Sequence, residues 1–305
     1  VKKSEWDGPG DRAIFFPWIA DVDNDGYNEV IVGHGRELFV LKWDGNEFTA
    51  HKIDRFSYQI FGCVAKDSNG DGIKEIHVTF GYPSLCIYRW NGTDYAKIFE
   101  ETWYGEESTI EAIDVGDVDN DGWYDLAVSK WANFYSCMYH NNSGSLQTSP
   151  SWTADNNDTQ KGVGWSDINH DGFPELAVGG SGLATQLYPN DEGTLGSIPS
   201  WESDNSYYGC QDLAWADIDG DGDEDLATVH FSTGHLRIYL NVEGELSSTP
   251  SWQYDASQVG TAVTFGDING DNAVDLIMGV SGQPCIMVFY NNNASEITEN
   301  NSLPE

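Results

Sequence analysis

The stretch Asp167–Gly179 reads DINHDGFPELAVG, and it decides the fold of this 305-residue chain because closely related stretches recur along it. Its five relatives begin at Asp21, Asp67, Asp117, Asp217 and Asp267, so consecutive copies start 46 or 50 residues apart. Six units of about 50 residues account for nearly the whole chain. A repeat of this length is typical of solenoids and propellers, in which each unit packs against its neighbours.

Each unit reads as four short β-strands. In the fourth unit we predict strands at residues 162–166, 175–178, 184–188 and 200–202. These segments are rich in β-branched and aromatic residues and are separated by Gly, Asn, Asp and Pro. No stretch longer than two turns has apolar residues at helical spacing. The sequence therefore predicts an all-β fold, a six-bladed β-propeller with four-stranded antiparallel blades, with a seven-bladed ring as the alternative.

The ends of the chain are expected to close the ring. Three units contain a Pro-Ser-Trp element ending at Trp152, Trp201 or Trp252, which lies 15 or 16 residues before the next acidic segment. Trp6 lies 15 residues before Asp21, whereas the last unit has no matching Trp, so we expect the N-terminal segment to supply the outer strand of the sixth blade. The predicted organisation is one domain over 1–290, with blades at about 12–54, 58–103, 109–155, 162–204, 210–255 and 261–290 plus 1–7, followed by a polar tail or linker at 291–305.

Composition excludes several kinds of partner. The chain has 14 Lys plus Arg against 50 Asp plus Glu, so it cannot neutralise a run of nucleic-acid phosphates, and it is poorly suited to an anionic membrane surface. No run of 18 apolar residues occurs, so no membrane insertion is expected.

The five Cys lack metal-ligand spacing and are predicted to be small buried residues. Asn-x-Ser/Thr triplets favour an extracellular or cell-surface location, and they begin at Asn91, Asn141, Asn157, Asn293 and Asn300.

The acidic segments are predicted to be metal-binding loops. Positions 1, 3, 5 and 9 carry side-chain oxygens in every unit, and alternate spacing aims the first three at one point. Position 6 is Gly in five units and Asn272 in the sixth, which permits a sharp bend with positive φ. Three or four carboxylates in one tight turn repel one another, and a hard divalent cation removes that repulsion. Calcium fits best because it accepts six to eight oxygens in irregular geometry, whereas magnesium requires a tighter octahedron.

About six Ca²⁺ sites are therefore predicted, each completed by a backbone carbonyl at position 7. An EF-hand is excluded because position 12 is Val, Thr or Met instead of Glu, and metal-free Asx-rich turns are a poor alternative for six copies of one acidic pattern. The predicted metal ligands are Asp21, Asp23, Asp25, Tyr27 and Glu29; Asp67, Asn69, Asp71, Ile73 and Glu75; Asp117, Asp119, Asp121, Trp123 and Asp125; Asp167, Asn169, Asp171, Phe173 and Glu175; Asp217, Asp219, Asp221, Asp223 and Asp225; and Asp267, Asn269, Asp271, Ala273 and Asp275.

These loops and the L-A-V-G-like strands after them make the chain resemble the FG-GAP/VCBS repeat family, which includes the β-propeller of integrin α subunits. The resemblance covers about residues 12–290. It implies calcium in the hairpin between the first two strands of each blade, on the face opposite the usual ligand-binding face. Integrin propellers have seven blades and only some carry calcium loops, so integrin partners are not carried over.

The face opposite the loops is the predicted ligand-binding face, where aromatic and polar side chains suit a sugar ring or a peptide. We expect a calcium-stabilised binding or adhesion module for a protein or carbohydrate, as a monomeric domain of a larger chain. One alternative is a polysaccharide lyase-like enzyme, with a His as base and a cation that neutralises a uronate; another is a structural spacer. Scarce cations and the absence of a nucleophile elbow, a zinc signature or a paired-carboxylate motif outside the loops argue against catalysis. The candidate ligand-binding residues are His34, Arg36, Tyr82, Lys130, Trp131 and His230, of which His34 or His230 would be the base and Arg36 or Lys130 the cation.

Overall fold

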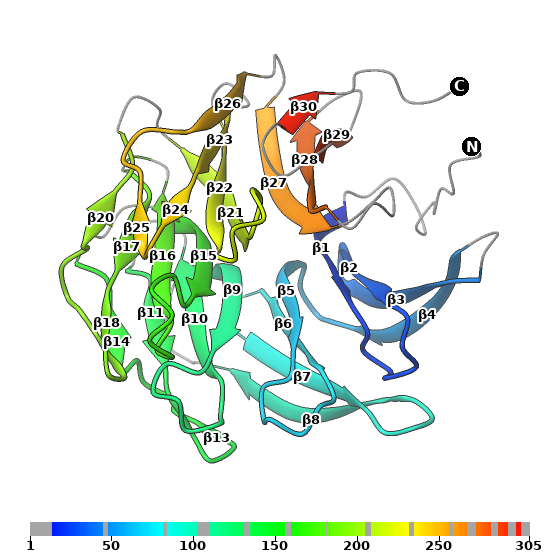
Figure 1. Cartoon of the computed structure of the whole chain (residues 1–305). Coiled ribbons are helices and arrows are strands. Elements are labelled where there is room, and N and C mark those ends of the chain that lie inside the picture. Colours follow the sequence, from blue (N-terminus) through cyan, green and yellow to red (C-terminus); the bar gives the residue numbers. More distant parts are fainter. Residues whose placement is uncertain are drawn as a thin grey trace.

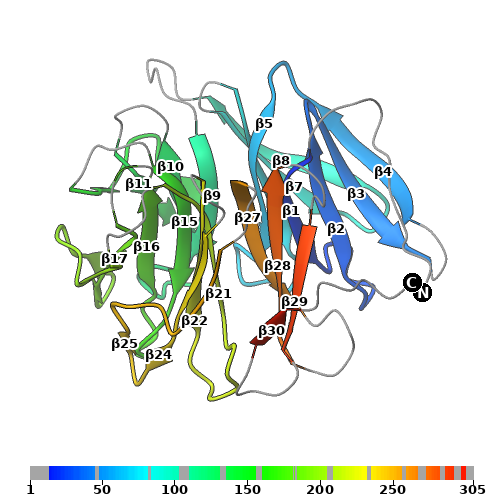
Figure 2. The ribbon, with the colours of Figure 1, turned by 90° about the horizontal axis from the view of Figure 1, so that it is seen from above.

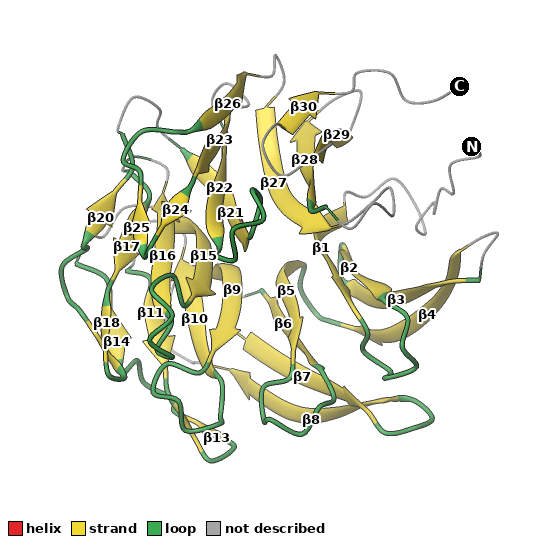
Figure 3. Ribbon diagram, in the orientation of Figure 1, coloured by secondary structure: helices red, strands yellow, loops and turns green. Residues whose placement is uncertain are grey.

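The fold is a ring of six four-stranded antiparallel sheets, which we call blades 1 to 6 (Figures 1 and 3). The predicted six-bladed β-propeller is therefore confirmed. Within the described part of the chain, no helix is long and apolar enough to cross a bilayer. The computed structural model describes residues 14–44, 48–81, 84–102, 110–130, 135–155, 160–180, 182, 184–204, 209–231, 235–255, 259–266, 273–281, 286–291 and 297–299.

The strands of each blade follow one another in sheet order. The four main strands are β1 (Ile14–Ala20), β2 (Glu29–His34), β3 (Glu37–Trp43) and β4 (Phe48–Arg55) in blade 1; β5 (Ile60–Lys66), β6 (Glu75–Phe80), β7 (Ser84–Trp90) and β8 (Tyr95–Thr102) in blade 2; β9 (Ile110–Gly116), β10 (Asp125–Lys130), β11 (Cys137–Tyr139) and β14 (Trp152–Thr153) in blade 3; β15 (Gln160–Ser166), β16 (Glu175–Gly180), β17 (Gln186–Tyr188) and β20 (Trp201–Glu202) in blade 4; β21 (Cys210–Ala216), β22 (Asp225–His230), β23 (His235–Tyr239) and β26 (Trp252–Asp255) in blade 5; and β27 (Val259–Gly266), β28 (Asp275–Ser281), β29 (Ile286–Asn291) and β30 (Ile297–Glu299) in blade 6.

Blades 3 to 5 each add a small hairpin between their third and fourth strands. These hairpins were not predicted, because their strands are only two residues long. They are β12 (Asn141–Asn142) with β13 (Ser145–Leu146), β18 (Asn190–Asp191) with β19 (Thr194–Leu195), and β24 (Asn241–Val242) with β25 (Glu245–Leu246).

The first strand of each blade lies nearest the middle of the ring and packs against the first strand of the next blade, from β1 against β5 through to β21 against β27. Blade 6 lies beside blade 1 in two perpendicular views (Figures 1 and 2). Every residue of β6, β10, β16 and β22 is buried. A second strand has a partner strand on both sides and a neighbouring blade on its faces, so its residues form the continuous core between blades.

The Pro-Ser-Trp tryptophans lie on the outer strands, as predicted, and they bind the next blade. Trp152 donates from its indole Nε1 to the Gly196 carbonyl at 2.8 Å, and its ring meets Tyr188 edge-on at 4.8 Å between centroids. Trp201 repeats this arrangement in the following blade, with Ser247 and Tyr239 as its partners. The outer strands of blades 3 and 4 are thereby held to the blade that follows each of them.

Replacing Trp201 with Ala is expected to lower the free energy of unfolding by about 3 kcal/mol, because it removes an inter-blade aromatic pair and a hydrogen bond. Urea unfolding followed by tryptophan fluorescence and far-UV circular dichroism measures the loss. Ile198→Ala is the control, since this exposed side chain lies nearby and its loss should change the free energy by no more than about 0.5 kcal/mol. Equal stabilities for the two variants would contradict the inter-blade role.

The outer strand of blade 6 differs from the prediction. This place is taken by β30, which pairs with β29 through Phe289–Glu299, Tyr290–Thr298 and Asn291–Ile297. Residues 1–7, for which we predicted this place, lie outside the described residues. Outer strands of this propeller need as few as two residue pairs, as in blades 3 and 4. A short polar segment within 291–305 is therefore sufficient, although nothing in its composition resembles the Pro-Ser-Trp elements.

The cysteines behave as small buried residues, as predicted. Cys63, Cys86, Cys137 and Cys210 are free and buried, and Cys285 lies outside the described residues. Burial raises the pKa of the Cys63 and Cys210 thiols to about 12, so the reactive thiolate is scarce at neutral pH.

Candidate metal centres

The acidic segments form the hairpin loops between the first and second strands of the blades, and all described loops lie at the same end of their blades. The loops of blades 1 to 5 are described, whereas Asp267, Asn269 and Asp271 of the sixth lie outside the described residues. The prediction for those three ligands is therefore not tested. Asp275, at position 9 of the sixth loop, is fully buried at the start of β28.

Each described loop is held in its bent shape by its own aspartates. In blade 4, Asp167 at position 1 accepts the backbone N–H groups of Asp171 at 3.1 Å and Gly172 at 3.0 Å. Asp171 at position 5 then accepts the N–H of Phe173 at position 7, at 2.9 Å. The same three bonds recur in blades 1, 2 and 3. In blade 5 the position-6 and position-7 bonds are the same, but Asp217 accepts the N–H of Gly220 at position 4 instead of that of position 5. The carboxylates at positions 1 and 5 are thus fixed in orientation by bonds to the loop backbone.

The bend uses two left-handed backbone positions. Position 6 is Gly with φ between +87° and +102° in all five described loops, as predicted. Position 4 is also left-handed, which the sequence analysis missed. Its occupants Asn24, Gly70, Asn120, His170 and Gly220 have φ between +57° and +80°. Apart from His170, these are the residue types that tolerate this conformation best.

Gly172→Ala is expected to lower the free energy of unfolding by about 1–2 kcal/mol through backbone strain alone. Its φ is +90°, and an added Cβ would meet nothing closer than the Asn120 amide nitrogen at 3.6 Å. Gly266→Ala is the matched control, because a Cβ there meets nothing within 4 Å and no left-handed φ is involved. Thermal and urea unfolding of both variants measures the two losses. A larger loss of unfolding free energy in Gly266→Ala than in Gly172→Ala would contradict the role of backbone strain.

Position 9 is a buried carboxylate in every blade. Glu29, Glu75, Asp125, Glu175 and Asp225 each accept the backbone N–H of position 2 at 2.9–3.2 Å. Burial raises the pKa of Glu29 and Glu175 to about 7, that of Asp125 and Asp225 to about 6, and that of Glu75 above its usual value. A nearby divalent cation would keep these carboxylates ionised at neutral pH.

Position 3 provides the clearest sign that the loops suit a cation. Asp23 Oδ1 and Asp119 Oδ1 are buried, and neither oxygen has a hydrogen-bond partner among the described residues. A buried carboxylate oxygen without a partner is costly. In blades 2 and 4 position 3 is Asn, and Asn69 and Asn169 donate to the position-9 glutamates at 3.0 and 3.2 Å.

The described carboxylates converge closely enough to share one ion. Three groups have carboxylate oxygens that all lie within 4.8 Å of one another, namely Asp21 with Asp23 and Glu29, Asp117 with Asp119 and Asp121, and Asp217 with Asp219 and Asp225. Calcium binds oxygens at about 2.3–2.6 Å, so oxygens around one ion lie up to about 5 Å apart. The convergence, the all-oxygen ligand set and the two unpartnered oxygens together fit calcium.

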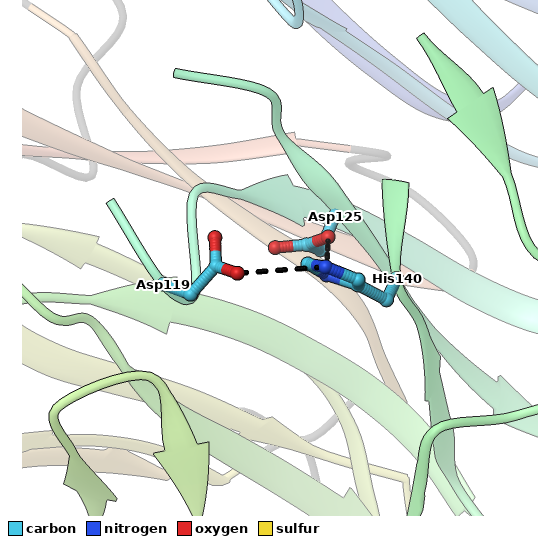
Figure 4. A group of neighbouring side chains, drawn as sticks. All are labelled: Asp119, Asp125 and His140. Atoms are coloured by element: carbon cyan, nitrogen blue, oxygen red, sulfur yellow. Dashed lines mark hydrogen bonds and ion pairs between the residues drawn. The ribbon is translucent and has the colours of Figure 1, made fainter. Parts of the chain in front are cut away.

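Basic side chains at the end of the third strand, or directly after it, reach the loops of blades 1 to 3, and the sequence analysis did not predict them. These residues are Lys42, Arg89 and His140. Figure 4 shows His140 between two carboxylates, with Nδ1 at 2.7 Å from Asp125 Oδ1 and Nε2 at 3.4 Å from Asp119 Oδ2. A signal was present, because each basic residue follows Leu or Tyr and precedes Trp or Asn where the third strand ends.

The small hairpins of blades 4 and 5 hold the loop of the preceding blade. Asn190 donates to the carbonyl of Val118, at position 2 of the blade 3 loop, and Asn241 donates to Ile168 in the blade 4 loop, both at 2.8 Å. In blade 6, Asn291 makes the same bond to Ile218 of the blade 5 loop at 2.6 Å. The shape of each of these loops is therefore coupled to the contact between two blades.

Three of the four predicted ligand-binding residues that the structure describes are buried. His34, Lys130 and His230 are 3%, 4% and 4% exposed, whereas Arg36 is exposed; Tyr82 and Trp131 lie outside the described residues. The buried positions follow from packing against neighbouring strands, for example Lys130 Nζ against the Tyr139 ring and hydroxyl. Exposed aromatic side chains at this end of the blades are Tyr58, Tyr135 and Phe231.

Comparisons with known proteins agree with this repeat architecture. A family model described as FG-GAP-like repeat matches residues 21–78, 67–128, 167–228 and 217–278, which together make up more than half of the chain. A chain in the crystal structure of the mitotic checkpoint complex is 14% identical, with a TM-score of 0.66, covering 100% of this chain and 89% of that chain.

Two crystal structures of BBS1N in complex with ARL6DN are similar as well. The one soaked with lead is 14% identical, with a TM-score of 0.59, covering 87% of this chain and 75% of that chain. The one soaked with mercury is 18% identical, with a TM-score of 0.55, covering 93% and 82%. Identities this low show the fold alone. The search of curated proteins found no match.

Proposed function

Because the chain belongs to the FG-GAP-like repeat family, we propose that it is a calcium-stabilised extracellular binding or adhesion module that recognises a protein or carbohydrate. The observation that carries the proposal is the same carboxylate-lined, backbone-braced loop at the same end of every described blade.

Calcium would be held by positions 1, 3, 5 and 9 of each loop and would supply two positive charges where carboxylates otherwise repel. The aspartates at positions 1 and 5 orient their oxygens through backbone bonds, and position 9 braces the loop from the core. Extracellular calcium concentrations suit sites of moderate affinity. Asn91, which begins an Asn-x-Thr triplet, is exposed in the turn between β7 and β8, in keeping with an exported protein.

Recognition is proposed at the face opposite the calcium loops. Tyr58, Tyr135 and Phe231 are exposed there, and Arg36 is an exposed cation on the same face. Aromatic rings beside polar groups bind sugar faces and peptide side chains. The burial of His34, Lys130 and His230 makes the lyase-like alternative less favourable, because a catalytic base must reach its substrate.

A double Tyr58→Ala/Phe231→Ala variant is expected to lose binding by about tenfold or more on an array of immobilised glycans and extracellular-matrix proteins. Val242→Ala is the control, because this exposed residue lies at the opposite end of blade 5. Binding lost in Val242→Ala and kept in the double variant would contradict the proposed face. Release of unsaturated uronate from acidic polysaccharides by the wild-type protein would favour the enzyme instead.

A further inference from the structure

We propose that Lys42 and Arg89 act as built-in counter-cations at the ion positions of blades 1 and 2, so that these two loops bind calcium much more weakly than those of blades 4 and 5. The inference rests on the proposed calcium function. It separates blades 1 and 2, whose loops carry a cation from the chain itself, from blades 4 and 5, whose loops need an ion from solution.

In blade 1 a single ammonium contacts three predicted ligands. Lys42 Nζ forms ion pairs with Asp23 Oδ2 and with Asp25 Oδ2, the latter at 2.6 Å. It also lies 3.7 Å from Glu29 Oε1. These oxygens come from positions 3, 5 and 9, which are the ones that calcium would bind at about 2.3–2.6 Å. The ammonium and the ion therefore compete for the same place.

Blade 2 uses a guanidinium for the same purpose. Arg89 forms an ion pair with Asp71 Oδ2 at position 5, and its Nε lies 3.5 Å from Glu75 Oε1 at position 9. The remaining polar groups of the loop are also engaged, since Asn69 donates to Glu75 and accepts from the Asp71 N–H. An incoming calcium ion must therefore displace the N–H donors of the Arg89 guanidinium from two of its carboxylate ligands, Asp71 and Glu75.

Strand register explains why only some blades have this cation. Leu41 pairs with Val30 and Tyr88 pairs with Ile76, so the next residue of the third strand, Lys42 or Arg89, lies beside the position-9 glutamate. In blades 4 and 5 the pairs are Tyr188 with Leu176 and Tyr239 with Leu226. The residues that follow are Pro189 and Leu240, which bring no charge to loops with three and four carboxylates.

Both side chains can move away from the loops without rearranging the fold, so they weaken calcium binding by competing with the ion. The side chains of Lys42 and Arg89 are 39% and 31% exposed, and Asp23 and Arg89 line one groove open to solvent. Calcium can therefore enter, but only after an ion pair with two or three carboxylates is broken. Breaking these short-range ion pairs costs enough free energy to weaken calcium binding by on the order of tenfold or more.

Calcium titration of the full chain by isothermal calorimetry, with ions counted by native mass spectrometry, tests the inference. Lys42→Gln and Arg89→Gln are each expected to gain one tight calcium ion over wild type, and the double variant two. Lys52→Gln is the matched control, because Lys52 pairs with Glu37 away from the loops. Leu240→Lys is the reciprocal variant and is expected to lose one tight ion, so the test does not depend on removing a cation.

The outcomes separate the inference from the proposed function. Wild type that binds six equally tight ions, with no gain in Lys42→Gln or Arg89→Gln, would overturn the counter-cation role and leave the calcium function standing. No calcium bound by any variant would overturn both.

Discussion

Removal of calcium is expected to lower the melting temperature by on the order of 20 °C. Each site filled at about 100 times its Kd stabilises the folded state by about 2.7 kcal/mol. For a chain of this size, about 1 kcal/mol corresponds to roughly 2 °C, and several loops contribute together. The loss should be large because three loops are bonded to the next blade by Asn190, Asn241 and Asn291, so a relaxed loop also weakens an inter-blade contact.

Differential scanning calorimetry of calcium-free and calcium-loaded protein measures this shift. Magnesium at the same concentration is the control, and it should restore less of the stability, because it requires a near-octahedral shell and keeps its waters. A melting curve that does not change when calcium is removed would show that the loops need no ion. A full rescue by magnesium would contradict the assignment to calcium.

The sequence was sufficient for the fold because its signals are local. The six loops, the strands on either side and the outer-strand tryptophans each depend on residues close together in the chain. The closure of blade 6 could not be found in this way, since β30 is three residues long and carries no aromatic residue. It pairs with β29 because this polar segment reaches the edge of the sheet, which its own residues do not reveal.

The candidate sites were only partly predictable for a related reason. The ligand positions are set by spacing within one turn, whereas Lys42 and Arg89 reach the loops from another strand, through cross-strand register. They lie 21 and 22 residues after the first ligand, so the signal for them is the pattern of neighbouring residues where the third strand ends, not a shared spacing from the loop. Likewise, His34 and His230 are at strand ends in the sequence, but their burial depends on neighbouring strands and blades.

The stability of the calcium-free protein is expected to fall as the pH rises from 5 to 8. Burial raises the pKa of Glu29 and Glu175 from 4.5 to about 7, and that of Asp125 and Asp225 from 3.8 to about 6. The folded state therefore holds these protons more tightly than the unfolded chain does. The stabilisation that these four protonated carboxyls give is complete below the pKa values of the unfolded chain. It is lost as the pH rises through 6 to 7, which lowers the free energy of unfolding by several kcal/mol in total.

With calcium bound, the dependence is expected to reverse over the same range. The ion requires ionised ligands, so its binding, and the stability it adds, increases as the carboxylates lose their protons. His77 is buried and its pKa is lowered to about 4, which weakens the folded state below pH 6.5. That effect is common to both conditions and cancels when the two are compared.

Melting temperatures at pH 5, 6, 7 and 8, for protein stripped on a chelating resin and for protein with excess calcium, test this reversal. The two curves should diverge with increasing pH, and the gap should open mainly between pH 5 and 7. Glu175→Gln is the informative variant, because an amide keeps the size of the side chain and cannot ionise. It should flatten the calcium-free curve and reduce the gain from calcium, whereas parallel curves for wild type would show that the position-9 carboxylates are not linked to the ion.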